Sequence, residues 1–139
     1  MVVLNGINFI LLSLLGLLHI YWAFGGKWGL DGVVPTLEEG TATFQPGFVI
    51  TLLVALALFT GAFLHIGYAI LLSDFYRTIG LLGMSFVFLI RAIGDFKYVG
   101  LFKKNKTTIF ARRDTRYYTP LCVLLAVNAF LASNVLQFL

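Results

Sequence analysis

The chain has 139 residues, of which 60% are hydrophobic and 12% are charged, against about 45–50% and about 25% in soluble domains. A soluble fold of this size has too little interior to bury so much apolar surface. The composition therefore excludes an ordinary soluble domain and indicates a membrane protein, because the bilayer takes the place of a core. A single cysteine, Cys122, excludes an internal disulfide and a Cys-x-x-Cys motif.

Four predominantly apolar segments follow one another along the chain. A helix needs about 20 such residues to cross a bilayer, and the segments predict helices at about 2–24, 46–73, 78–95 and 118–138. Glycine and proline residues between the first two segments are typical of a loop. We expect one all-α domain over residues 1–139, folded as an up-and-down bundle of four transmembrane helices.

The basic residues are distributed unevenly between the predicted connections. The second connection holds only Arg77, whereas the first and third hold Lys27, Lys97, Lys103, Lys104, Lys106, Arg112, Arg113 and Arg116. Cytoplasmic loops carry the positive excess, which predicts the first and third connections in the cytoplasm and both termini outside. The same charges predict attraction to anionic lipid head groups. No recognisable nucleic-acid-binding module accompanies them, so no nucleic-acid partner is expected.

This topology gathers polar residues from three helices and two connections at the cytoplasmic end. The layer comprises His19, Tyr21, Trp22, Trp28, Asp31, Glu38, Glu39, Arg91, Asp95, Asp114, Tyr117 and Tyr118. Arg91 is its strongest member, because an arginine inside a membrane helix costs about 2.5–3.5 kcal/mol on insertion scales.

Two interpretations of Arg91 stay open. It could form an ion pair with Asp95, which follows four residues later, with Asp114 or with a carboxylate of the first connection, and so fix how the third helix docks. Alternatively it could recognise an anionic group, because a guanidinium binds carboxylate or phosphate through two hydrogen bonds.

The two histidines do not predict a cofactor site. His19 is expected in the cytoplasmic third of the membrane and His65 in the outer third, too far apart to ligate one haem. No cluster has the spacing of zinc ligands, and neither a metal nor a cofactor is expected. On the outer side we expect hydrogen bonds between helices from Asn5, Asn8, His65, Tyr68 and Asn134, with Asn128 near mid-depth.

Several motifs resemble those of a known family. They are His19-Ile-Tyr-Trp-Ala-Phe-Gly-Gly-Lys-Trp-Gly, Val34-Pro35, Arg91-Ala-Ile-Gly-Asp95, and Asp114 with Tyr118-Thr-Pro-Leu-Cys122. Together they resemble the bacterial domain of unknown function 3995, a family of small four-helix membrane proteins. The resemblance implies a location in the bacterial inner membrane and no established activity. Its motif positions here are His19, Trp22, Trp28, Pro35, Arg91, Asp114, Tyr118 and Pro120.

The leading functional hypothesis is a membrane protein that binds, or helps to transport, a lipid or small amphipathic anion in a pocket open to the cytoplasm. The predicted ligand-binding residues are Arg91, His19, Tyr118, Asp95, Asp114, Trp22 and Trp28. Arg91 would hold the negative group, His19 and Tyr118 would orient it, and the two tryptophans would line the entrance. One alternative is a structural or regulatory subunit, with a second copy or another membrane protein as its partner. Another is a membrane enzyme for a lipid or isoprenoid substrate, but no enzyme motif is present and no catalytic residue is predicted.

Overall fold

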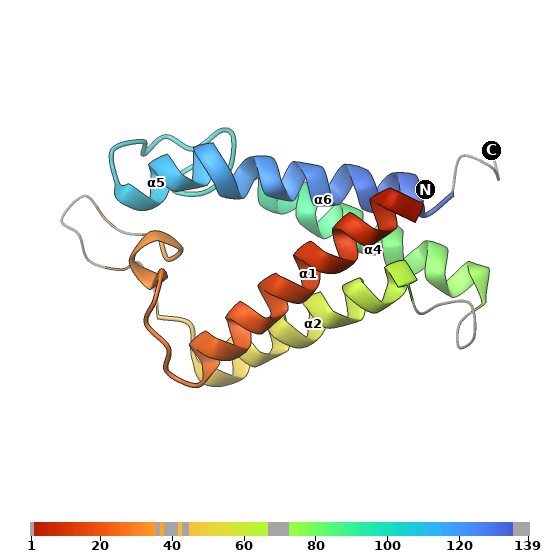
Figure 1. Cartoon of the computed structure of the whole chain (residues 1–139). Helices are drawn as coiled ribbons and strands as arrows, with labels where there is room; N and C mark the ends of the chain where they lie inside the picture. The colour runs from red at the N-terminus through yellow and green to blue at the C-terminus, as the bar shows by residue number, and fades with distance from the viewer. Residues whose placement is uncertain (1, 36, 38–41, 43–44, 67–72, 135–139) are drawn as a thin grey trace.

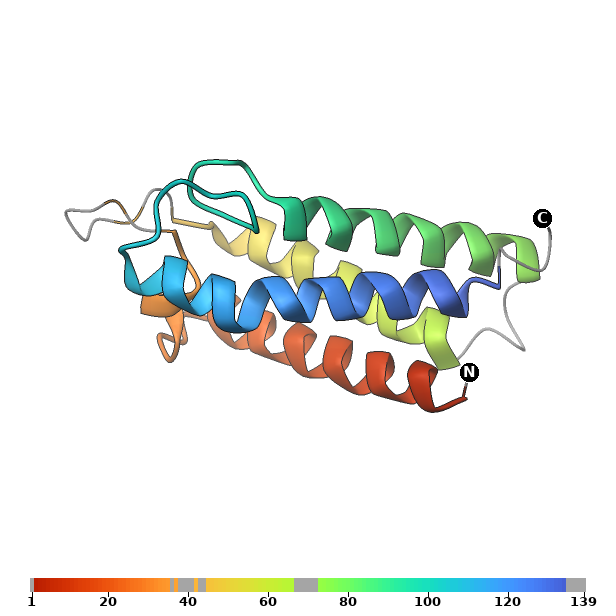
Figure 2. The ribbon, with the colours of Figure 1, turned by 90° about the horizontal axis from the view of Figure 1, so that it is seen from above.

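The computed structural model describes residues 2–35, 37, 42, 45–66 and 73–134. Its longest helices are α1 (Val2–Ala23), α2 (Phe48–Ile66), α4 (Asp74–Ile93) and α6 (Thr119–Ala132), and three short elements accompany them: the 3₁₀ turn η1 (Leu30–Gly32), α5 (Ile109–Arg113) and the π-helical turn η2 (Asp114–Tyr118). The four long helices lie side by side (Figure 2), which confirms the all-α fold.

Three helices have the length and hydropathy of a membrane-spanning segment. They are α1, α2 and α4, with 22, 19 and 20 residues. Helix α6 has 14 residues and is not among them. Within the described residues, three of the four predicted segments are therefore candidate membrane-spanning helices by length and composition. The predicted end of the second helix, at residue 73, comes after residues 67–72, which lie outside the described residues, and the predicted end of the fourth, at residue 138, lies outside them as well.

Helix α4 begins earlier than residue 78, the predicted start. Ser73 precedes it in an extended conformation, and Asp74 occupies the first turn, where a negative charge interacts favourably with the helix dipole. Arg77, expected in the connection, is consequently a buried helix residue, and its Nε donates a hydrogen bond to the carbonyl oxygen of Leu64 (3.3 Å). The prediction that Arg77 lies in a loop is wrong.

The fourth helical segment also begins earlier than predicted. The side chain of Thr108 accepts a hydrogen bond from the N–H of Ala111 (3.1 Å) and caps α5; α5, η2 and α6 then follow without a break. A loop extending to Tyr117 was therefore the wrong expectation. Pro120 is a local cause of the π-helical turn. In a regular α-helix its ring would clash with the carbonyl group four residues earlier, and it has no N–H to donate to that carbonyl. Here the N–H of Thr119 bonds instead to the carbonyl of Asp114, five residues back.

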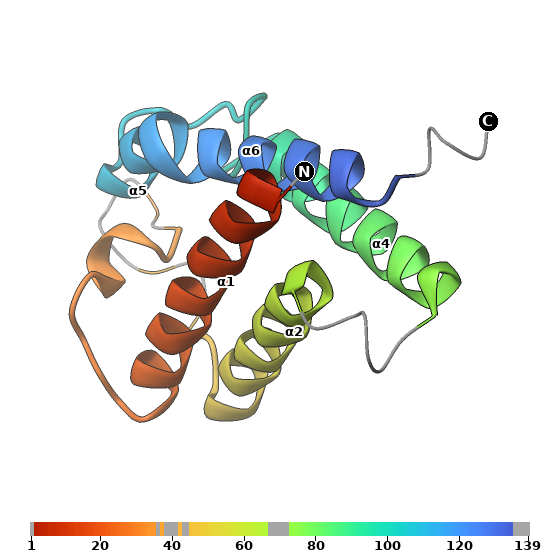
Figure 3. The same cartoon turned by 45° about the vertical axis from the view of Figure 1, so that its right-hand side comes forward.

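The helices form two closely packed pairs, α1 with α2 and α4 with α6, with far fewer contacts between the pairs. Helix α1 starts beside the end of α6 and diverges from it toward the opposite end of the molecule (Figures 1 and 3). We call the end that holds both chain termini the closed end, and the end that holds the first and third connections the open end (Figure 1).

Small side chains fill the helix contacts, whereas large apolar ones face outward. Ala55, Ala62, Ala126, Ala129 and Ala132 are buried, while many leucine, isoleucine, valine and phenylalanine side chains are exposed. Small residues let membrane helices approach closely, and exposed apolar surface on this scale marks contact with lipid or protein. A compact core of Leu12, Ala62 and Leu125 joins the pairs near the closed end.

Candidate functional site

A large cavity lies at the open end, where the two helix pairs diverge. Its volume is about 1190 Å³, above the range of about 300–1,000 Å³ typical of small-molecule sites. All four long helices line it, and residues of η1 and α5 complete the wall near the connections. The cavity exists because α1 and α2 lean away from α6 at this end (Figure 3).

The inner wall of the cavity is apolar. Leu15 of α1, Leu58 of α2, Phe88 of α4, and Leu121 and Leu125 of α6 contribute to it. Leu125 also belongs to the core, so the cavity reaches from the open end toward the closed end of the bundle. Such a wall suits a hydrocarbon chain and offers little to a strongly hydrated solute.

The outer part of the cavity is polar. Arg91 of α4, His19 of α1, Tyr118 at the end of η2, Arg112 of α5 and Asp31 of η1 all line it. Three distant parts of the sequence thus bring a cation, an imidazole and a phenol together. Arg112 was not among the predicted site residues, because it was read only as part of a basic loop.

The guanidinium group of Arg91 has a hydrogen-bond partner at one nitrogen and none at another. Its Nη2 donates to the carboxylate of Asp114 (2.8 Å), while its Nη1 is buried and has no hydrogen-bond partner among the described residues. The side chain is 33% exposed. A buried guanidinium nitrogen without a partner costs free energy, so Arg91 is oriented by the protein and still able to accept an anion.

Asp114 is the hub of this arrangement and is fully buried. One oxygen accepts from Arg91; the other accepts from the backbone N–H of Gly100 (2.8 Å) and from Nζ of Lys103 (3.0 Å). Through these bonds Asp114 ties the third connection to α4.

The burial of Lys103 was not predicted from the sequence. It is buried, and its Nζ also donates to the carbonyl of Gly100 (3.0 Å). In the sequence it stands among exposed lysines, and nothing in the local pattern separates it from Lys104. Unlike Arg91, it does not line the cavity.

Asp95 is not the partner of Arg91, although it follows four residues later. Helix α4 ends at Ile93, and Gly94 turns the chain with a positive φ of 84°, so the spacing rule for helices no longer applies. The Asp95 carboxylate instead accepts from the N–H groups of Lys97 (3.0 Å), Tyr98 (2.7 Å) and Val99 (2.9 Å). Partial burial raises its pKa, but these bonds more than compensate and lower it. Asp95 is a turn-stabilising residue outside the cavity wall.

His19 and Tyr118 present polar atoms to the cavity. The Nδ1 of His19 bonds to the carbonyl of Leu15 (2.8 Å), so Nδ1 carries the proton and Nε2 remains an acceptor. Neither Nε2 nor the Tyr118 hydroxyl has a hydrogen-bond partner within the described ranges.

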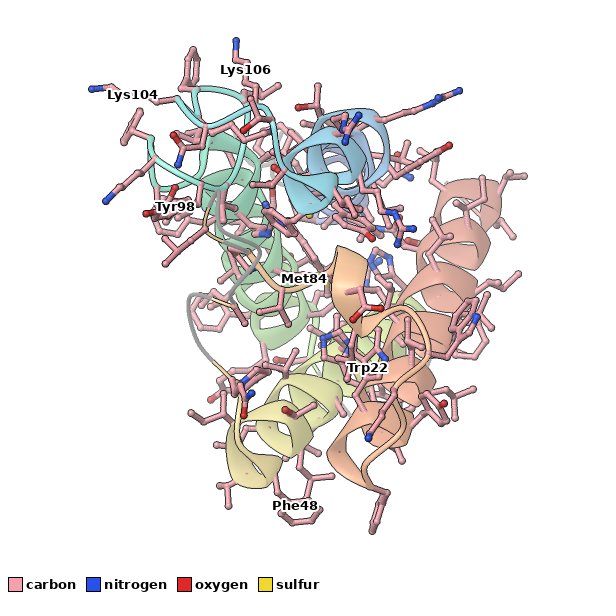
Figure 4. All side chains as sticks on the ribbon, turned by 90° about the vertical axis from the view of Figure 1, so that its left-hand side faces the viewer. Trp22, Phe48, Met84, Tyr98, Lys104 and Lys106 are labelled. Atoms are coloured by element: carbon pink, nitrogen blue, oxygen red, sulfur yellow. The ribbon has the colours of Figure 1, made fainter. Side chains whose placement is uncertain are left out.

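Only one of the two tryptophans lines the entrance. Trp22 lies in the cavity wall and projects toward the middle of the open end (Figure 4); its ring packs edge-on against His19, with centroids 5.1 Å apart. Its Nε1 donates to the carbonyl of Trp28 (2.9 Å). The Trp28 side chain is 74% exposed and outside the cavity wall, so the structure does not place it where the sequence interpretation did. Glu38 and Glu39 lie outside the described residues.

The closed end holds a polar cluster of a different kind. His65 Nδ1 donates to Asn5 (3.0 Å), its Nε2 accepts from Asn8 (3.1 Å), and the Asn8 oxygen accepts from Asn128 (3.1 Å). The Asn8 amide also reaches the carbonyl of Leu125 at 3.4 Å. Three of the residues expected to bond on the outer side thus do so, together with Asn128, expected near mid-depth. Tyr68 lies outside the described residues. Asn8, the partner of His65, is 11 positions from His19 on α1, which corresponds to about 16 Å at 1.5 Å per residue. His65 and His19 therefore lie at different ends of the bundle.

Comparison with known proteins identifies a family and no characterised relative. No curated protein and no solved structure matches the chain. A family model described as protein of unknown function (DUF3995) matches residues 12–129, a range that contains the Arg91, Asp114 and Lys103 cluster and the cavity walls. The chain therefore belongs to the DUF3995 family of proteins of unknown function.

Proposed function

We propose that this protein binds a lipid or small amphipathic anion in its open-end cavity, as a multi-pass protein of the bacterial cytoplasmic membrane. The anionic group is held by Arg91. It is oriented by Tyr118, whose hydroxyl donates to it, and by His19, whose Nε2 accepts from a protonated oxygen of the same head group. The hydrocarbon part lies against the apolar inner wall. The function is binding, or a step in transport in which a second copy or another membrane protein completes the path.

One observation carries the proposal: Arg91, whose buried Nη1 has no partner among the described residues, lines a cavity whose inner wall is apolar. A ligand with one anionic end and one hydrocarbon end satisfies both features at once. A free inorganic anion would make no contact with the apolar inner wall. A neutral lipid would provide no anionic partner for the guanidinium group of Arg91.

The proposed topology places both termini outside and the cavity toward the cytoplasm. Its support is the charge bias, since the first and third connections, together with the adjoining α5 and η2 at the open end, carry most of the lysines and arginines. We propose that the fourth crossing combines α5, η2 and α6. Residues 109–132 are helical throughout, which gives a length of about 36 Å, compared with a hydrocarbon core of about 30 Å.

The alternative is a structural or regulatory subunit, and the bond between Arg91 and Asp114 favours it. If this ion pair were the whole role of Arg91, the cavity would hold only unspecific lipid. The two functions differ in what the loss of Arg91 does.

The test uses two variants that each remove one cation from Asp114. Arg91→Gln alters the cavity, whereas Lys103→Gln removes a buried lysine outside the cavity wall and serves as the matched control. Native mass spectra are recorded after gentle extraction and incubation with tetradecyl phosphate as the probe, with tetradecyl maltoside as the uncharged comparison. We expect the wild type and Lys103→Gln to retain the phosphate adduct and Arg91→Gln to lose it while staying folded. Equal adducts in all three proteins would favour the subunit function.

A further inference from the structure

The third connection carries a second surface, independent of what the cavity binds. We infer that residues 94–108, here called the basic loop, form a rigid wedge that inserts its apolar side chains into an anionic lipid head-group layer. The sequence indicated only a general attraction between lysines and lipid; the structure adds the apolar side chains, their position and the rigidity of the loop.

The apolar part of this surface is formed by Phe96, Leu101 and Phe102. They are 58%, 58% and 62% exposed, and the rings of Phe96 and Phe102 lie next to each other with centroids 6.2 Å apart. Neighbouring exposed apolar side chains in a connection mark a contact with lipid or protein.

The backbone places these side chains at the edge of the membrane-spanning region. The N–H of Leu101 donates to the carbonyl of Ala92 in the last turn of α4 (2.8 Å). The loop therefore folds back along the end of α4 instead of extending away from it. Ile90, in the same part of α4, is also exposed.

The loop is held in one shape by several independent hydrogen bonds. Asp95 accepts from three backbone N–H groups, and Asp114 holds the Gly100 N–H and Lys103. Phe96 has a positive φ of 62°, a conformation that L-residues other than glycine adopt rarely. The protein thus maintains an unfavourable backbone conformation at the residue whose ring is presented outward, which is a feature of preorganised binding surfaces.

Charge identifies lipid as the occupant. Lys104 and Lys106 point outward, away from the bundle, in the view onto the open end (Figure 4). Basic side chains beside exposed aromatic ones are the combination that anionic membrane surfaces attract.

The test measures how deeply Phe102 lies in the membrane. The only cysteine, Cys122, is replaced in a Cys122→Ala background, and nitroxide labels are attached to Phe102→Cys or, as the matched control in the same loop, to Lys106→Cys. Collision rates with oxygen, which partitions into lipid, and with a water-soluble nickel complex are measured in nanodiscs of phosphatidylcholine with or without phosphatidylglycerol.

We expect the ratio of oxygen to nickel collisions to be several-fold higher at position 102 than at 106 when phosphatidylglycerol is present, and to fall at 102 in its absence. Nickel access at 102 equal to that at 106 would overturn the inference. Protection of 102 from both reagents would also overturn it, because this result indicates a protein contact. A ratio at 102 that is equal in the two lipid mixtures would refute the role of charge. None of these outcomes depends on a ligand in the cavity.

Discussion

The two ends of the bundle use polar residues in opposite ways. At the closed end, the chain from Asn5 through His65 and Asn8 to Asn128 gives each participating histidine nitrogen a partner. At the open end, Arg91, His19 and Tyr118 line a cavity, and within the described part of the chain Arg91 Nη1, His19 Nε2 and the Tyr118 hydroxyl have no such partners. Buried polar groups are normally satisfied; the His65 cluster at the closed end meets this rule, whereas the buried Nη1 of Arg91 does not.

The same comparison separates two layers at the open end itself. Asp114 and Lys103 are buried and bonded to each other and to the chain. Arg91 is bonded to the same carboxylate but also faces the cavity. Substitutions at single residues can test whether the buried pair of Asp114 and Lys103 stabilises the fold while Arg91 also serves the cavity.

The largest effect is expected from Asp114→Asn. The change leaves the buried Lys103 without its counterion and weakens the hold on Arg91, and breaking a buried ion pair costs about 3–5 kcal/mol. Thermal unfolding in detergent measures the loss. Asp95→Asn is the control, because its carboxylate is exposed and bonds only to backbone groups; its destabilisation should be clearly smaller. Equal losses would contradict the central role of Asp114.

A smaller loss of stability is expected at the closed end from Asn8→Ala. The substitution removes the donor to His65 and the acceptor for Asn128, and hydrogen bonds between membrane helices are worth about 1–2 kcal/mol in model peptides. Asn5→Ala, which removes one bond to His65, should cost less. Both variants should keep the affinity for tetradecyl phosphate. A loss of affinity at constant stability would break the division between the two ends.

The smallest effect is expected at η1. A side chain at Gly32 would overlap the guanidinium of Arg113, which can move aside; Gly32→Ala should therefore change the unfolding free energy by less than about 0.5 kcal/mol. Because η1 forms part of the cavity wall, the bound probe should dissociate faster. Gly47→Ala, in the same connection but with open space around it, is the control in the kinetic measurement. Equal dissociation rates would show that η1 does not cover the ligand.

Much of the fold could be read from the sequence, because apolar segments of helical length are a local property. Counting along those segments also predicted that His19, Arg91 and Tyr118 lie at the same end of the bundle, where they line one cavity. What local patterns could not supply are the pairings across the bundle. Asp114 was one of several candidate partners of Arg91, and only the end of α4 at Ile93 removes Asp95 from the helix face. The burial of Lys103 depends on a loop conformation that lysine-rich composition does not reveal.

The most direct test of the account is a titration with tetradecyl phosphate, followed by the fluorescence of Trp22 beside the cavity in a Trp28→Phe background. The account predicts that Arg91→Gln weakens binding at least about tenfold, equivalent to about 1.4 kcal/mol, while Lys103→Gln lowers the unfolding temperature and leaves the affinity near that of the parent. If both variants bind like the parent, or if the probe binds no better than tetradecyl maltoside, Arg91 is a structural residue and the cavity does not select an anion.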